Sequence, residues 1–191
     1  MEIEKRTSGN ELSEAANYSS IGASYYKNKE YDKAIENYQK ALEISERSLE
    51  ENDPNIARNY NDLALAYDKK KDFDKAIEFY QRAIYIDLQT VGENNIIVAT
   101  NYNNLGTAFF NKKYYNKAIE NFENAIAIDL KTVGKNDRNT ASHYGNLGFA
   151  YLKNNDKKNA LKSFQKVVDI SKKLKIDDWV SYFEKKIAQI K

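Results

Sequence analysis

Asparagine side chains in a recurring pattern are the residues of this sequence best suited to specific chemistry. The stretch NYNNLGTAFF, residues 101–110, places Asn101, Asn103 and Asn104 beside a Tyr, Leu, Gly and Phe pattern. An amide both donates and accepts hydrogen bonds, so the chemistry that these residues offer is recognition of other polar groups. The alternative is compositional, because the chain is rich in Asn and Lys in its other segments as well.

The sequence offers no recognisable catalytic or metal-binding group. Its one histidine, His143, has no serine or carboxylate partner at a recognisable spacing, and we expect an ordinary surface histidine. The chain has no Cys, which excludes disulfides, thiol catalysis and cysteine metal sites. Gly92 and Gly134 stand alone rather than in a phosphate-binding loop. We therefore predict that the protein is not an enzyme and has no cofactor and no metal.

The asparagine-rich stretch has near copies 42 residues apart, and this period organises most of the chain. Four of its positions fall at i, i+3, i+4 and i+7, which is one face of an α-helix, and the small residue there should let another backbone come close. The matching residues are Tyr18, Tyr60, Tyr102 and Tyr144; Ile21, Leu63, Leu105 and Leu147; Gly22, Ala64, Gly106 and Gly148; Tyr25, Tyr67, Phe109 and Tyr151.

A second helical pattern follows each first one after a polar break. Asp53 before Pro54 predicts a helix start, while Gly92 and Gly134 stand where a left-handed residue should end a helix. With a single Pro in 191 residues, we expect an all-α chain. The expected first helices are 12–27, 54–69, 96–111 and 138–153, and the second helices are 30–50, 72–91, 114–133 and 156–174.

Composition limits the partners and the location of the protein. The net charge of +2 is close to balance, so a nucleic-acid partner is not expected. The N-terminus has no apolar core of a signal peptide, and no later stretch approaches eighteen uninterrupted apolar residues. We expect a cytoplasmic protein with no membrane partner.

The period ends after Lys175, yet one more helix is expected. In DDWVSYFEKKIAQIK, Trp179, Phe183, Ile187 and Ile190 follow helical spacing behind an Asp177 or Asp178 cap. We interpret this segment as a capping helix, because an array of repeats must cover its open end.

The repeated set of Tyr, Leu, Gly or Ala and aromatic positions, followed by Ala and aromatic positions in the second helix, resembles the tetratricopeptide repeat (TPR). The 42-residue length and the turns TVGENN and TVGKND resemble the kinesin-light-chain variety of that repeat. The resemblance implies a right-handed α-solenoid of four helix-turn-helix repeats. It implies a TPR array over residues 1–175, with repeats at about 10–51, 52–93, 94–135 and 136–175, and a capping helix over 176–191.

The resemblance also implies a concave groove that is lined mainly by first helices and holds a peptide. Residues next to the packing stripe of the first helices should face this groove. Amides would bind the peptide backbone, and apolar and basic residues would select its side chains. The candidate peptide-binding residues are Asn61, Asn103, Asn104, Asn146, Lys27, Arg58, Lys69, Lys153, Phe110, Phe149 and Leu152.

We therefore expect a protein–protein interaction module that binds an extended or helical peptide segment. The alternative is an architectural spacer or oligomerisation unit, part of a larger multidomain protein. The identity of the partner and the oligomeric state are left open by the sequence.

Overall fold

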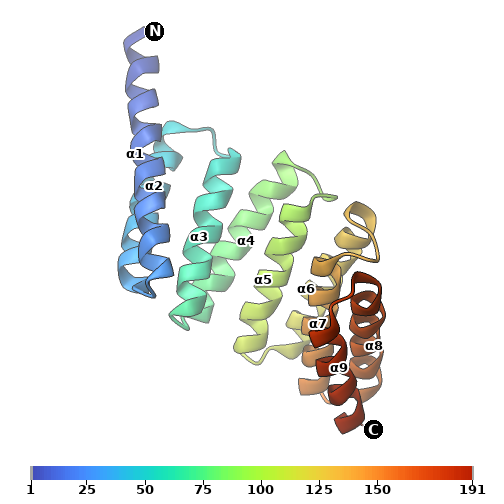
Figure 1. Cartoon of the computed structure of the whole chain (residues 1–191). Coiled ribbons are helices and arrows are strands. Elements are labelled where there is room, and N and C mark those ends of the chain that lie inside the picture. Colours follow the sequence, from blue (N-terminus) through green and yellow to red (C-terminus); the bar gives the residue numbers. More distant parts are fainter. Residues whose placement is uncertain (1, 191) are drawn as a thin grey trace. The chain divides into compact units, whose positions relative to one another are not determined.

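The computed structural model describes residues 2–190 of the chain, and side chains from residue 10 to residue 190 (Figure 1). Over residues 2–190 the chain forms helices joined by short turns and contains no strand, so the all-α prediction is confirmed. The helices are α1 (Glu2–Lys27), α2 (Tyr31–Ser48), α3 (Pro54–Lys69), α4 (Phe73–Thr90), α5 (Ile96–Asn111), α6 (Tyr115–Thr132), α7 (Arg138–Lys153), α8 (Lys157–Leu174) and α9 (Asp177–Ile190).

The predicted helix boundaries are confirmed except at the start of the chain. The first helices α3, α5 and α7 have the predicted bounds, and the second helices differ from them by at most two residues. The prediction for α1 was wrong, because this helix begins at Glu2 rather than at residue 12. The packing pattern that set the prediction starts only near Tyr18, so it does not mark where the helix begins.

The chain divides into two compact units, Met1–Gly92 and Glu93–Lys191. In the first unit, α1 packs on α2, α2 on α3, and α3 on α4. In the second unit, α5 packs on α6, α6 on α7, α7 on α8, and α8 on α9. Each unit thus contains two helix pairs, and the second unit also contains α9. No helix within residues 2–190 has the length and apolar character needed to span a bilayer.

Within each helix pair, the small residue of the first helix makes room for an aromatic ring of the second helix. A Cβ atom added to Gly106 would lie 2.8 Å from Cδ1 of Phe122, and one added to Gly148 would lie closer still to Cε1 of Phe164. The expectation that the small residue admits a neighbouring backbone was therefore incomplete, because its main neighbour is a ring. Phe122 and Phe164 are almost completely buried.

Most of the turns between helices pass through a left-handed residue. Within each pair, the turn passes through a left-handed residue with φ between 62° and 66°, namely Lys29, Lys71, Lys113 and Asn155. Between pairs, Gly92 and Gly134 have φ of 79° and 86°, as predicted for helix-ending glycines. The predicted cap at Asp53 is also present, since its Oδ1 accepts a hydrogen bond from the backbone N–H of Asn55 at 2.8 Å.

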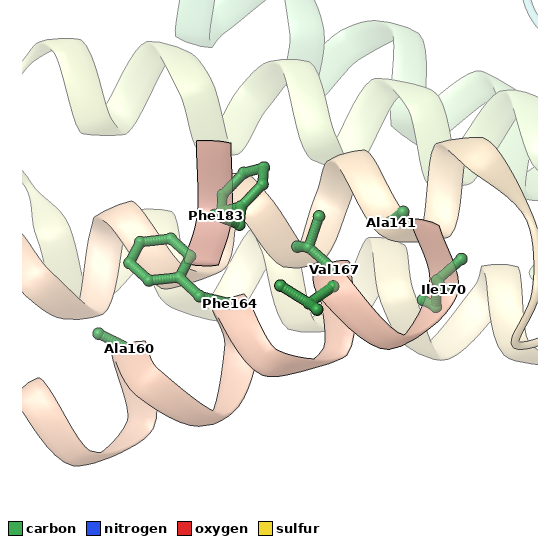
Figure 2. Close-up of a cluster of buried hydrophobic side chains, with 7 residues drawn as sticks. Ala141, Ala160, Phe164, Val167, Ile170 and Phe183 are labelled. Carbon is green, nitrogen blue, oxygen red and sulfur yellow. The ribbon is translucent and has the colours of Figure 1, made fainter. Parts of the chain in front are cut away.

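Helix α9 packs on α8 through an apolar cluster that Figure 2 shows in close-up. The buried members are Ala141, Ala160, Phe164, Val167, Val168, Ile170 and Phe183. Phe183 is the buried residue that α9 contributes, and Trp179, Ile187 and Ile190 of α9 pack against the cluster, as their spacing predicted. Asp177 and Asp178 lie in the first turn of α9 rather than before it, where their charges favour the positive end of the helix dipole.

We expect Phe183→Ala to lower the free energy of unfolding by about 3 kcal/mol, because it removes a buried ring and leaves a cavity beside Phe164. Urea unfolding followed by circular dichroism measures this change. Tyr182→Ala is the matched control, since this neighbouring ring is 48% exposed and should change stability by less than about 1 kcal/mol. A loss for Phe183→Ala no larger than that of the control would contradict a packed α9.

Candidate functional site

The second unit contains a cavity of about 330 Å³ between first helices α5 and α7, with Phe122 of α6 in its wall. Three of the predicted binding residues, Phe110, Asn146 and Phe149, line it together. The full lining is Thr107, Phe110, Asn111, Phe122, Asn146 and Phe149. The cavity therefore combines three aromatic side chains with amide and hydroxyl groups.

Two predicted amides join the two first helices beside this cavity. Nδ2 of Asn146 donates a hydrogen bond to Oδ1 of Asn103, with a distance of 2.9 Å between the two atoms. The bond is diagonal, because Asn103 corresponds by the 42-residue period to residue 145 rather than to Asn146. Asn104, the periodic counterpart of Asn146, is half-buried on α5 and does not belong to the cavity lining.

The aromatic walls of the cavity are held by further rings. Phe149 meets Phe164 edge to face at 5.0 Å between ring centroids, and it lies 6.1 Å from Phe183. Phe110 meets Tyr115 edge to face at 5.5 Å. Such contacts restrain the rings, so the cavity walls are preformed. Leu152, predicted to face the groove, is partly buried and packs against the apolar cluster that includes Phe183 of α9, as Phe149 also does.

The predicted basic residues lie at helix ends or in another cavity. Lys27, Lys69 and Lys153 are exposed and are the last residues of α1, α3 and α7, where a positive charge favours the helix dipole. Their position thus has a structural explanation independent of any ligand. Arg58 is exposed and lines a cavity of about 300 Å³ in the first unit.

The first unit has a polar network beside Arg58. Ser19 Oγ donates to Asn59 Oδ1 at 3.1 Å, and Asn59 Nδ2 donates to Ser45 Oγ at 2.8 Å. The predicted Asn61 lies nearby on α3, and its buried Oδ1 has no hydrogen-bond partner among the described residues. A buried acceptor without a donor is costly, so Asn61 is a position where added polar contacts would be favourable.

Asp62 has a shifted pKa and is not among the predicted binding residues. Burial raises the pKa of its carboxyl group to about 6, and the positive charge of Arg58 only partly opposes this change. The signal in the sequence was its position, because Asp62 replaces the Asn that stands at 104 and 146 in later repeats. The first unit therefore carries a carboxylate where the second unit carries neutral amides.

His143 is not a surface residue, and that expectation was wrong. It is 5% exposed, and its Nδ1 lies 2.7 Å from Oδ2 of the fully buried Asp129. The pair joins second helix α6 to first helix α7. It occupies the same repeat positions as Ser45 and Asn59, which join α2 to α3 in the first unit. A pair so enclosed has no access to a substrate, and it stabilises the junction between two repeats. The described residues contain no cluster of three or more side chains arranged for a metal ion.

The described residues form a protein of repeated helix pairs, with cavities between neighbouring helices. The family model of the tetratricopeptide repeat matches residues 13–89 and 97–173. The chain therefore belongs to the tetratricopeptide repeat family. No curated protein matches the chain.

Several solved structures have a fold similar to that of this chain. A Podosopora anserina protein, described as a putative kinesin light chain with nearly identical TPR-like repeats, is 21% identical with a TM-score of 0.76 and covers 85% of this chain and 77% of its own. BtubC (BKLC) from P. vanneervenii is 21% identical with a TM-score of 0.66 and covers 99% and 90%. The apo form of RapI is 19% identical with a TM-score of 0.79 and covers 90% and 61%. The predicted resemblance to the kinesin-light-chain variety is thus confirmed as a likeness of fold.

We expect Asp62→Asn to stabilise the first unit at pH 7.5 by about 1–2 kcal/mol and to have little effect at pH 4. The pKa of Asp62 rises from 3.8 to about 6 on folding, so the folded state favours the protonated carboxyl, and wild-type stability falls as the pH rises through this range. Urea unfolding at several pH values measures the difference. Equal pH dependence in the two proteins would show that Asp62 is not desolvated.

We expect Ser171→Ala to be neutral or to stabilise the chain by up to about 1 kcal/mol, because Ser171 Oγ is buried without a hydrogen-bond partner among the described residues. Ser45→Ala is the matched variant at the same repeat position. It should destabilise by about 1–2 kcal/mol, since it leaves the buried amide of Asn59 without its 2.8 Å partner. Thermal unfolding of both variants tests the contrast, and equal losses would contradict it.

Proposed function

We propose that the chain is a protein–protein interaction module whose second unit binds a peptide segment of a partner at the cavity between α5 and α7. The observation that carries the proposal is the meeting of Phe110, Phe149 and Asn146 around one cavity of about 330 Å³. This volume lies within the range of ligand sites, roughly 300–1,000 Å³. The aromatic lining suits one apolar side chain of a partner.

The amide pair beside the cavity suits the backbone of such a segment. The bond between Asn103 and Asn146 uses Oδ1 of Asn103 and Nδ2 of Asn146. Nδ2 of Asn103 and Oδ1 of Asn146 then offer a donor and an acceptor, which are the groups that one peptide unit complements. Each such hydrogen bond contributes about 1 kcal/mol, so the amide pair would add affinity for any peptide backbone. The aromatic lining would select the side chain of the peptide.

The exposed lysines at the ends of the first helices add a preference for acidic residues. Lys153 ends α7, a helix that lines the second-unit cavity, and Lys27 and Lys69 end α1 and α3 in the first unit. Attraction by such exposed charges is screened by salt, and it would act mainly on the rate of association. The proposed ligand is therefore an extended or helical segment with an apolar anchor and some acidic residues, bound without a catalytic step. We place this activity in the cytoplasm, because a chain without cysteine suits a reducing compartment.

We expect an array of random peptides to show enrichment of one class of segment, and we expect Asn146→Ala and Phe110→Ala each to weaken binding roughly tenfold, or about 1.4 kcal/mol. Fluorescence anisotropy with an enriched peptide measures the affinity. Asn154→Ala is the matched control, because Nδ2 of Asn154 also donates to an asparagine, Asn116, at 2.8 Å, but outside the cavity.

Two results would overturn the proposal. One is an array without enrichment, and the other is binding that Asn146→Ala and Phe110→Ala leave unchanged while both variants remain folded. Concentration-dependent self-association in sedimentation experiments, combined with either result, would favour the alternative of an oligomerisation unit.

A further inference from the structure

A larger cavity lies in the first unit, away from the predicted binding residues. It has a volume of about 630 Å³ and is formed by α2, the turn after it, α3 and α4. None of the residues proposed for peptide binding lines it. Its lining is Glu46, Glu51, Asn52, Ile56, Tyr60, Glu78, Gln81, Arg82, Tyr85 and Ile86.

The cavity already holds one guanidinium group of its own chain. Arg82 lies over the ring of Tyr60, 5.5 Å from its centroid, and its Nη1 donates to the Tyr60 hydroxyl at 3.2 Å. Its Nη2 forms an ion pair with Glu78 at 3.1 Å. The Tyr60 hydroxyl in turn donates to Glu46. Aromatic rings and carboxylates are the two groups that favour a guanidinium, so the cavity has the chemistry of an arginine site.

Arg82 contacts only part of the charged and apolar surface of the cavity. Three carboxylates, those of Glu46, Glu51 and Glu78, line the cavity together with the single cation of Arg82. Tyr85 adds a second ring, and this residue is 61% exposed, which is unusual for a large aromatic residue. The nearly buried Ile56 and Ile86 provide an apolar floor.

This combination occurs where the first repeat meets the second, and it does not follow from the repeat signature. The positions of Tyr85 in the other copies hold Glu43, Ala127 and Asp169. Residues at the position of Glu46 in later copies are Leu88, Leu130 and Lys172. Packing of the repeat therefore requires neither Tyr85 nor Glu46.

We propose that this cavity of the first unit binds an arginine-containing basic segment of a partner protein. The partner's guanidinium would stack on Tyr85 and donate to the carboxylates in a planar, bidentate arrangement, which a lysine cannot reproduce. Its aliphatic stem, or a neighbouring apolar side chain, would lie on Ile56 and Ile86. The Glu78–Arg82 ion pair is about half exposed on both sides, so it opposes such an exchange of partners only weakly.

A peptide of alternating arginine and leucine, labelled with fluorescein, is the probe for this site. Titration of the ¹⁵N-labelled full chain should shift the amide signals of residues 46–56 and 78–86, and anisotropy should give the affinity. The lysine–leucine peptide should bind at least threefold more weakly, and the glutamate–leucine peptide should not bind.

Substitutions of exposed residues distinguish binding at this cavity from nonspecific electrostatic attraction. Tyr85→Ala and Glu51→Gln should each weaken the binding of the arginine peptide at least fivefold. Neither should change the midpoint of thermal unfolding, because both side chains are exposed. Glu120→Gln is the matched control, since Glu120 is the counterpart of Glu78 in a repeat that has Ala127 instead of Tyr85. It should have no effect on affinity.

The proposal fails if the arginine peptide causes no shifts in residues 46–56 and 78–86, or if Tyr85→Ala, Glu51→Gln and Glu120→Gln weaken it equally. It also fails if the shifts map to residues 103–111 and 146–149, which would assign the peptide to the second-unit cavity. Conversely, Asn146→Ala should leave the arginine peptide unaffected, so the two proposed sites can be tested independently.

Discussion

The packing of an aromatic ring onto a residue without a large side chain is the contact on which the rest of this structure depends. Phe122 and Phe164 occupy the space that a side chain at Gly106 and Gly148 would need, and Tyr38 does the same at Gly22. Because the ring replaces a side chain, the two helices of each pair are fixed both in separation and in register. The second repeat has Ala64 at this position, so a methyl group is the largest substituent found there in the four copies.

Polar contacts then set the register between successive helix pairs. Apolar contacts alone are not directional, whereas a buried hydrogen bond has a direction and requires a particular partner. The bonds from Asn59 to Ser45 and between His143 and Asp129 occur at the same place in two repeats, one in each unit. At Ser171 the next position belongs to α9, which is outside the period, and the buried hydroxyl has no partner among the described residues. Helix α9 thus replaces the apolar cover of a further repeat but not its polar contact.

Features that depend on local pattern could be predicted from the sequence, whereas features that join repeats could not. The helices followed from apolar spacing, and the turns followed from Asp53, Gly92 and Gly134, because each is determined within a few residues of chain. The burial of His143 was missed because its partner lies on the preceding helix pair, and no rule of spacing within a helix connects them. The diagonal bond from Asn146 to Asn103 was missed for the same reason, because the two residues lie on first helices of different repeats. The cavity next to Tyr85 was missed because its lining comes from three helices and a turn.

Repetition itself indicates where function should be sought in such a chain. Residues that recur in all four copies are explained by packing, so they cannot distinguish one ligand from another. Differences between copies carry that information, and the structure places two of them at cavities. Phe149 stands where an earlier copy has Thr107, and Tyr85 stands where others have acidic residues or alanine. A charged or aromatic residue at a position that packing leaves free has no cost to the fold if it is exposed, and selection for a partner can therefore act on it without loss of stability.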